Sequence, residues 1–164
     1  MKKTIRLILI FLSGAMVAQE ATTAEEKKLY DPTADAKEQI AEAVKQAKAE
    51  GKHVMLQMGG NWCGWCILFD KKVKADPTLS KALYDNYVPV HINYSPENKN
   101  EEVFASLGYP QRFGFPVFVV LDGDGNRIHT QDSVYLEEDK GHNAKEILKF
   151  FTIWSPKALE APKY

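Results

Sequence analysis

The two cysteines of the chain, Cys63 and Cys66, are separated by two residues in the stretch Trp62-Cys63-Gly64-Trp65-Cys66. An apolar run typical of a buried strand precedes this stretch, and a helical pattern follows it. Because the unpaired amides and the dipole at the start of a helix favour an anion, we expect the Cys63 thiol to ionise more easily than a free thiol. Its thiolate can attack a disulfide, and Cys66, one helical turn further on, can then resolve the mixed disulfide by closing a ring with Cys63. The pair therefore predicts thiol–disulfide exchange.

Two tryptophans flank the cysteines with a large apolar surface. Trp62 and Trp65 would either dock an unfolded substrate or shield the sulfur atoms. For Trp62, packing within the domain explains the residue equally well, so its role stays open at this point.

Other functions of a C-x-x-C pair fit the sequence less well. A structural zinc site needs four ligands, and the four histidines lie at no ligand spacing: His53, His91, His129 and His142. Haem attachment needs a histidine directly after the second cysteine, where the chain has Ile67. An inert structural disulfide would close too short a loop to stabilise the fold much. We therefore predict no metal site and no organic cofactor, because the cysteine pair is itself the redox centre.

The composition is that of an ordinary globular protein. The chain has 164 residues, of which 45% are hydrophobic and 26% charged, and this suits one compact domain with little room for a second. The net charge of −1 shows no basic surplus of the kind that nucleic-acid-binding proteins carry, so we predict no nucleic-acid partner. With only two cysteines, the chain cannot be a small protein that several disulfides hold together.

Residues 1–18 have the pattern of a secretory signal peptide. Three basic residues open the chain, the apolar run of residues 7–12 follows, and small residues lead to Ala18 before a polar break at Gln19. The apolar stretch is too short for a membrane span of roughly 20 residues. We expect cleavage after Ala18 and export to the periplasm or the medium, with an uncleaved anchor or a buried helix as the alternative.

Helical and strand patterns alternate along residues 35–155, which we predict to form the domain, between a loose leader (19–34) and a C-terminal tail (156–164). The predicted helices cover residues 35–51, 67–76, 78–86 and 103–107, and a last one is capped by Asn143. The predicted strands cover residues 53–58, 88–93, 117–121 and 127–130, the last two joined as an antiparallel hairpin. This order predicts an α/β domain with one mixed sheet and helices on both faces. Residues 131–141 carry no predicted structure or role.

The sequence resembles the thioredoxin superfamily over about residues 36–152. The stretch that contains Cys63 and Cys66 is similar to the family's W-C-G-x-C active site, and Phe115-Pro116, before an apolar strand, is similar to its cis-proline. With the export signal, the nearest likeness is to periplasmic, Dsb-type oxidoreductases. The resemblance implies a thioredoxin fold, a central mixed β-sheet flanked by helices, in which Pro116 faces the cysteines and helps to exclude metal. It also implies that the backbone of Phe115 pairs with a substrate strand.

Two positions depart from the family pattern. Many thioredoxins have a buried aspartate six positions before the first cysteine, and this chain has Gln57 there, which cannot titrate. The family's lysine on the following strand is replaced by Pro89 or a neighbour. Proton transfer at Cys66 must therefore use water or a different carboxylate, or be slow. The loop of residues 94–102 resembles an insertion.

These features predict an exported thiol–disulfide oxidoreductase that reduces or isomerises disulfides of exported proteins and takes its electrons from a membrane-bound thiol–disulfide donor. We expect a monomer. A disulfide-forming oxidase with the same residues is one alternative, because the direction depends on the reduction potential. A non-catalytic thioredoxin-fold module that binds metal or unfolded protein is another. The predicted site comprises the catalytic residues Cys63 and Cys66 and the substrate-binding residues Trp62, Trp65, Phe115 and Pro116.

Overall fold

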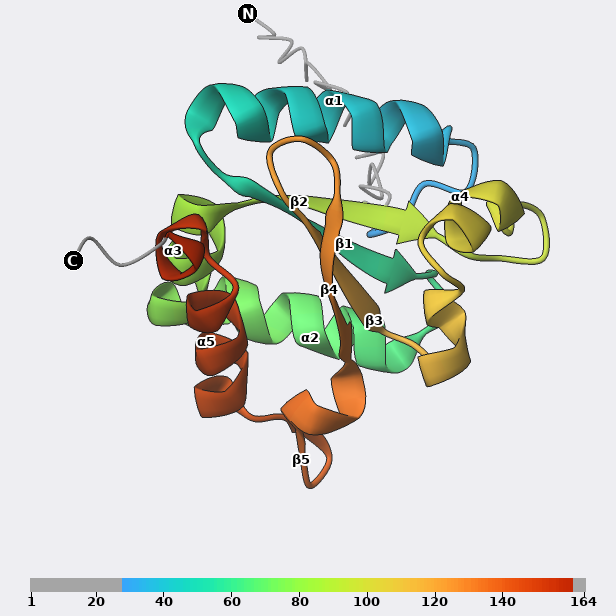
Figure 1. The fold of residues 1–164 in the computed structure, drawn as a ribbon. Helices are drawn as coiled ribbons and strands as arrows, with labels where there is room; N and C mark the ends of the chain where they lie inside the picture. The colour runs from blue at the N-terminus through green and yellow to red at the C-terminus, as the bar shows by residue number, and fades with distance from the viewer. Residues whose placement is uncertain (1–27, 161–164) are drawn as a thin grey trace, which may run out of the picture.

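The computed structural model describes residues 28–160, so the predicted signal peptide, residues 1–18, lies outside the described part of the chain. A four-stranded sheet forms the middle layer, and helices cover both of its faces (Figure 1). The helices are α1 (Ala36–Glu50), α2 (Gly64–Ala75), α3 (Pro77–Asn86), α4 (Glu101–Ser106) and α5 (Ala144–Ile153). None of these helices is long and apolar enough to cross a membrane. The predicted α/β fold with a mixed, helix-flanked sheet is confirmed.

The strands of the sheet follow the order β2-β1-β3-β4. They are β1 (His53–Gly59), β2 (Tyr87–Asn93), β3 (Val117–Leu121) and β4 (Arg127–Asp132). Strand β1 is parallel to β2 and antiparallel to β3, and β3 is antiparallel to β4. All residues of β1 are buried, because the strand is central and both faces of the sheet are covered. This burial on both faces explains why residues 53–58 form an apolar run in the sequence.

Each face of the sheet has its own apolar cluster. Side chains alternate along a strand, so Val54, Leu56 and Met58 pack under α1 and α4, whereas Met55 packs against α2, α3 and α5. Gln57 shares the parity of Met55 and therefore faces α2. This register brings a buried polar side chain of β1 toward the helix that carries the cysteines.

Helix α1 begins and ends at the residues that the sequence indicates. The Asp35 carboxylate accepts hydrogen bonds from the amides of Lys37 and Glu38, at 2.8 and 3.2 Å. Gly51 ends the helix with φ = 65°, a left-handed conformation that glycine adopts at no steric cost, and its amide bonds to the Ala47 carbonyl. The predicted caps of this helix are confirmed.

The stretch without a predicted structure, residues 131–141, completes β4 and then forms a short 3₁₀ turn (Ser133–Leu136). It ends in a small hairpin of β5 (Glu137–Glu138) and β6 (Gly141–His142). Further 3₁₀ turns cover Pro110–Phe113 and Pro156–Leu159.

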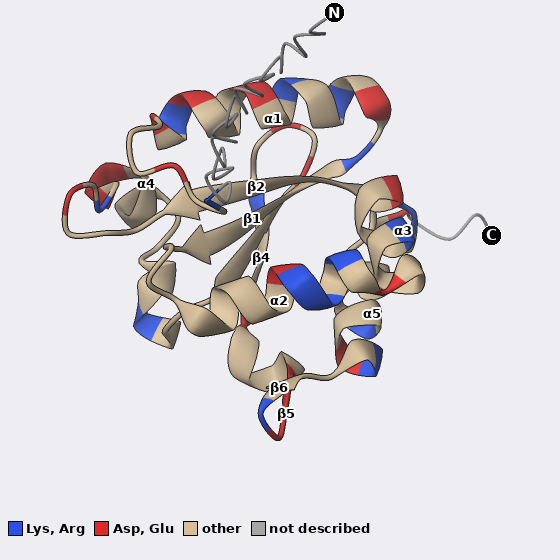
Figure 2. Ribbon diagram, turned by 180° about the vertical axis from the view of Figure 1, so that it is seen from behind, with Lys and Arg blue, Asp and Glu red and all other residues tan. Residues whose placement is uncertain are grey.

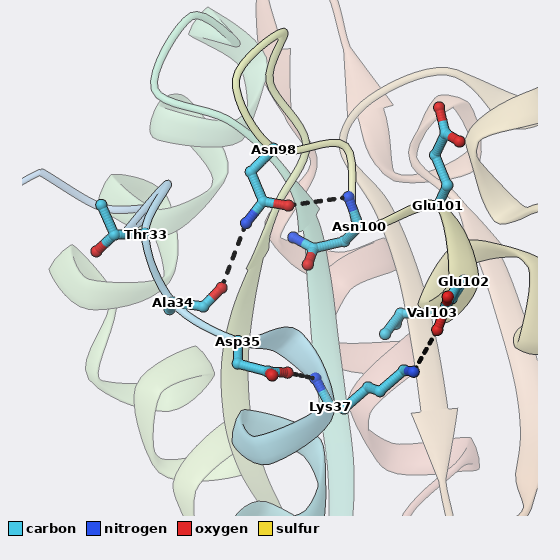
Figure 3. A pocket seen from close by; sticks show the side chains of 9 residues that line it. All are labelled: Thr33, Ala34, Asp35, Lys37, Asn98, Asn100, Glu101, Glu102 and Val103. Atoms are coloured by element: carbon cyan, nitrogen blue, oxygen red, sulfur yellow. Dashed lines mark hydrogen bonds and ion pairs between the residues drawn. The ribbon is translucent and has the colours of Figure 1, made fainter.

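The leader, residues 19–34, is predicted to be loose, and this is wrong for its last residues. Tyr30 is completely buried. The Asn98 side chain, from the insertion-like loop, donates a hydrogen bond of 3.1 Å to the Pro32 carbonyl. It also donates one of 3.4 Å to the Ala34 carbonyl (Figure 3). The end of the leader is thus packed into the domain, because it contributes a buried aromatic side chain and bonded backbone groups.

Asp76 both ends α2 and caps α3, and its carboxylate accepts from the amides of Thr78 and Leu79, at 2.8 and 3.2 Å. We expect Asp76→Ala to lower the free energy of unfolding by about 1 kcal/mol, since both amides lose their partner. Urea unfolding measures this. The control is Asp85→Ala, which removes only a surface ion pair with Lys81 and should change the free energy by less than about 0.5 kcal/mol. Equal losses in the two variants would contradict the capping role.

Candidate active site

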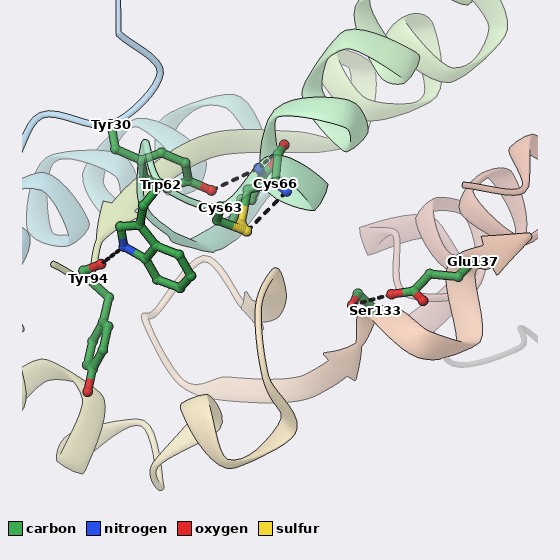
Figure 4. Close-up of a disulfide and its surroundings, with 8 residues drawn as sticks. Tyr30, Trp62, Cys63, Cys66, Tyr94, Ser133 and Glu137 are labelled. Atoms are coloured by element: carbon green, nitrogen blue, oxygen red, sulfur yellow. Dashed lines mark hydrogen bonds between the residues drawn. A yellow bond between two sulfur atoms is a disulfide. The ribbon is translucent and has the colours of Figure 1, made fainter. Parts of the chain in front are cut away.

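Cys63 and Cys66 form a disulfide at the start of α2, with their Cα atoms 5.3 Å apart (Figure 4). Cys63 is the N-cap residue of the helix, and its Sγ accepts a hydrogen bond of 3.2 Å from the backbone N–H of Cys66. Residues three apart share one face of a helix, so this spacing lets the two sulfur atoms meet. The predicted placement of the pair at a helix N-terminus is confirmed.

The start of α2 favours a thiolate on Cys63 over one on Cys66. No residue in the first turn is acidic, and the charged residues of α2 lie in its later turns (Figure 2). The helix dipole and the Cys66 amide both stabilise a negative charge on Cys63. Cys63 is 4% exposed and Cys66 is fully buried, so an incoming disulfide reaches Cys63 first.

The peptide bond between Phe115 and Pro116 is cis, as the resemblance implies. Strand β3 begins at the next residue, Val117, which pairs with Met58 near the end of β1. Phe115 packs against the cluster formed by the two cysteines and Tyr30, and Pro116 is buried. The structure therefore brings this dipeptide to the same end of the sheet as the disulfide.

Trp62 and Phe115 form an aromatic surface next to Cys63. Trp62 is 57% exposed, although its Nε1 donates a 2.7 Å hydrogen bond to the Tyr94 carbonyl. Its ring meets the Phe115 ring edge to face, with centroids 5.4 Å apart, and the Tyr94 ring lies 5.0 Å from Phe115 on centroids. Trp65 is half-buried and packs edge to face on His142 instead, at 5.3 Å. The two tryptophans thus have different neighbours, and Trp62 is the more exposed.

Gln57, at the position of the family's aspartate, is buried and donates two hydrogen bonds. Its Nε2 bonds to the hydroxyl oxygen of Tyr30 at 2.9 Å and to the backbone carbonyl of Cys66 at 3.0 Å. A carboxylate could not donate to that carbonyl. Gln57 therefore ties β1 to the first turn of α2 and to Tyr30 without placing a charge there.

Tyr30 is a site residue that the sequence reading did not single out. Its backbone N–H donates to Asn61 Oδ1 at 3.0 Å, and Asn61 Nδ2 donates to its carbonyl at 2.7 Å. Because Asn61 directly precedes Trp62, this pair of bonds joins the leader to the loop that carries the cysteines. Burial raises the pKa of the Tyr30 hydroxyl well above its usual value, so the side chain is a neutral phenol. The available signal was Leu29-Tyr30, an apolar pair in an otherwise polar leader.

The glycines at the end of β1 allow these groups to approach closely. A Cβ atom on Gly59 would lie 2.5 Å from Cys66 Sγ and 2.9 Å from the Tyr30 hydroxyl oxygen. A Cβ on Gly60 would lie 2.8 Å from the Tyr94 carbonyl oxygen that binds Trp62. Contacts of this length are too short for carbon, so both positions require glycine for steric reasons.

A charged cluster borders the site on the α2 side of the sheet. Asp70 of α2 lies 2.8 Å from Lys74 Nζ and 3.6 Å from His91 Nε2 of β2. The His91 ring meets the Tyr30 ring edge to face, at 5.4 Å. Burial lowers the pKa of His91, with Asp70 acting in the opposite direction. Within residues 28–160, no group of three or more His, Cys, Asp or Glu side chains is arranged to hold a metal ion.

A disulfide at the start of a helix, next to a cis-proline that precedes an antiparallel strand of a mixed sheet, defines a thioredoxin-like domain. The family model described as "Thioredoxin-like" matches residues 35–123, more than half of the chain. The chain belongs to this family, and the resemblance seen in the sequence is confirmed.

Comparison with known proteins finds similarity to disulfide-exchange proteins. Over 87 residues the chain is 36% identical to the thiol:disulfide interchange protein DsbD of Escherichia coli K12, an alignment that covers 53% of this chain. The chain spans only 15% of the length of that relative. The crystal structure of a disulphide isomerase from Xylella fastidiosa Temecula1 matches with a TM-score of 0.67 and 28% identity, over 75% of this chain and 93% of the other. The oxidised C-terminal domain of DsbD from Neisseria meningitidis shares the fold, with a TM-score of 0.51 and 19% identity over 72% and 94% of the two chains.

We expect Asn61→Ala to release the leader from the active-site loop. The change leaves the backbone N–H and carbonyl of Tyr30 without their partners, which should lower the free energy of unfolding by about 1–3 kcal/mol. Amide hydrogen exchange of residues 29–34 should also become faster. The control is Asn86→Ala, which removes a single bond to the Ala82 carbonyl at the end of α3 and should leave exchange in the leader unchanged. Unaltered exchange in Asn61→Ala would contradict the docking role.

We also expect His142 to make the fold sensitive to acid. It is 6% exposed, neither ring nitrogen bonds to a described group, and burial lowers its pKa below the ordinary value of about 6.5. The unfolded chain therefore binds the proton more readily, and stability is lost as the pH falls through about 6.5. His142→Phe should make the free energy of unfolding depend less on pH between about pH 7 and about pH 5. Tyr87→Phe, which removes no group titrating in this range, should keep the wild-type dependence, and the same dependence in His142→Phe would refute the assignment.

Proposed function

We propose that this protein is an exported thiol–disulfide oxidoreductase that reduces or isomerises disulfides in protein substrates. The observation that carries the proposal is the Cys63–Cys66 disulfide at the start of α2, with the cis Phe115–Pro116 bond at the same end of the sheet. The names of its relatives, a thiol:disulfide interchange protein and a disulphide isomerase, support the same chemistry.

In the proposed reaction the protein starts as a dithiol. The Cys63 thiolate attacks a substrate disulfide, which forms a mixed disulfide and releases one substrate thiolate. The Cys66 thiolate then attacks Cys63 Sγ, so the Cys63–Cys66 bond forms and the second substrate thiolate leaves. The two released thiolates take up protons from water, equal in number to those that the cysteines lost. The substrate gains two electrons, and a dithiol donor must return two electrons and two protons to the protein.

The aromatic surface formed by Trp62, Tyr94 and Phe115 is the proposed contact for the substrate. It is apolar and lies next to Cys63, so it suits an extended segment of an unfolded chain. Phe115 lies two residues before β3, which begins at Val117. Its peptide groups are therefore outside the β1–β3 pairing and can pair with such a segment. Pro116 offers no amide hydrogen. Trp65 packs against the buried cluster of Tyr30 and the two cysteines, so we include it in the proposed substrate contact.

Export, partner and oligomeric state complete the proposal. The basic start and short apolar run of residues 1–18 support export with cleavage after Ala18. An exported reductase needs reducing equivalents from outside its own compartment, so we include a membrane-bound thiol–disulfide donor as its partner.

We propose that the protein acts as a monomer. We also propose that its folded domain begins at Leu29 rather than at residue 35, because Tyr30 belongs to the site.

The deciding measurement is the reduction potential of the Cys63–Cys66 pair, from free thiols after equilibration in glutathione or dithiothreitol buffers. We expect a value near that of thioredoxin, about −270 mV, and catalysis of insulin reduction by dithiothreitol. Cys63→Ser should abolish this turnover, whereas Cys66→Ser should accumulate mixed disulfides that the wild type resolves.

A potential near about −120 mV would instead make the protein an oxidant and reverse the proposed direction. If the cysteine pair cycles in neither buffer and the Cys63→Ser variant still binds metal or unfolded chains, the protein would be a binding module and not an enzyme.

A further inference from the structure

We propose that the Tyr30 hydroxyl donates a hydrogen bond to the Cys66 sulfur when the disulfide is reduced, and so stabilises the Cys66 thiolate that resolves the mixed disulfide. The inference rests on the proposed function, because it concerns the resolving step of that reaction. It assigns a task at the buried sulfur to a residue that precedes α1.

The hydroxyl and the sulfur lie over the same point of the sheet. The Cβ position of Gly59 is 2.9 Å from the Tyr30 hydroxyl oxygen and 2.5 Å from Cys66 Sγ, so the two atoms are no further apart than the sum of these distances. Tyr30, Cys63 and Cys66 also form one buried cluster. Since Gly59 has no side chain, no Cβ atom at this position separates the hydroxyl from the sulfur.

The hydrogen bonds of Tyr30 leave its hydroxyl hydrogen available. Gln57 Nε2 donates to the hydroxyl oxygen and thus occupies one of its lone pairs. Within residues 28–160, the hydroxyl donates to no other group. Asn61 holds the backbone of Tyr30 through two bonds, so the ring cannot leave without breaking them. A phenol fixed in this way is a suitable donor to a thiolate that forms beside it.

The titratable groups around this point are few and come from three elements. Asp70 and Lys74 of α2 pair with each other, and His91 of β2 meets the Tyr30 ring edge to face. His142 of β6 lies on the other side, against Trp65. No described bond joins any of these four groups to the Tyr30 hydroxyl or to a sulfur, and Tyr30 carries the one hydroxyl of the buried cluster that it forms with the two cysteines.

Tyr30 acts as a donor and not as a base. In the resolving step Cys66 loses its proton to water and attacks Cys63 Sγ, and the substrate thiolate that leaves takes a proton from water. The electron pair of Cys66 forms the new S–S bond, and the pair of the broken bond departs with the substrate. Tyr30 keeps its proton throughout, since burial keeps the phenol neutral. Its effect is to lower the pH at which Cys66 becomes a thiolate.

The test is the pH titration of Cys66 in the Cys63→Ala protein, followed by carbon NMR of the cysteine Cβ. Adding Tyr30→Phe should move the titration to higher pH. In the protein with both cysteines the same change should slow resolution of a mixed disulfide at neutral pH by about threefold to tenfold, because the higher nucleophilicity of a more basic thiolate offsets part of the loss. The matched control is Tyr87→Phe, which removes another buried hydroxyl, bonded to the Phe151 carbonyl, and should leave the titration unchanged.

A titration that Tyr30→Phe does not move, or that Tyr87→Phe moves equally, would overturn the proposal. If Tyr30→Phe fails to fold, fluorotyrosine at position 30 decides, because its hydroxyl is a stronger donor and should move the titration to lower pH. The titration needs no turnover, so it separates the two proposals. A shifted titration in a protein that catalyses no exchange would leave the role of Tyr30 standing and remove the proposed function.

Discussion

The site depends on a close approach at the carboxyl end of β1. At Gly59 the strand has no side chain, and Cys66 Sγ and the Tyr30 hydroxyl fill the space that a Cβ would need. Because α2 starts only a few residues later, the helix must begin directly against the strand. The result is an asymmetric disulfide, in which Cys66 is fully buried against β1 while Cys63 keeps 4% of its surface exposed. Thiol–disulfide exchange needs this asymmetry, since one sulfur must meet the partner and the other must wait behind it.

The polar groups next to the buried sulfur are neutral. Gln57 and Tyr30 supply hydrogen bonds without charge, and the carboxylate of Asp70, one turn further along α2, is paired with Lys74. A buried carboxylate beside Cys66 would accept a proton but would also repel the thiolate. A neutral donor does the opposite, because it stabilises the thiolate and takes no proton. With Gln57 in place of the family's aspartate, the site therefore has a neutral hydrogen-bond donor where a charged proton acceptor would stand.

Much of the fold was predictable, because its signals are local. The caps of α1, the buried run of β1 and the cysteine spacing each depend on neighbouring residues, and the structure confirms all three. Tyr30 was not predictable in this way, since its partners lie 27 and 31 positions further along the chain. The leader is polar on average, and only tertiary contacts show that its aromatic residue belongs to the site. Residues 131–141 escaped prediction for a related reason, because the 3₁₀ turn packs on α5 and the small hairpin packs on α2, and neither has an apolar period.

One loop connects the buried and the exposed parts of the site. Asn61 binds the backbone of Tyr30 on one side, and Trp62, the next residue, binds the Tyr94 carbonyl on the other. Cys63 follows directly, so its position is set by the docked leader and by the aromatic surface together. Tyr30 and Phe115 also pack directly against the two cysteines, so a movement of either would act on Cys63. Residues 29–34 therefore act as a structural support of the cysteine loop. A protein shortened to the start of α1 would lose a part of its active site even though the sheet and its helices were complete.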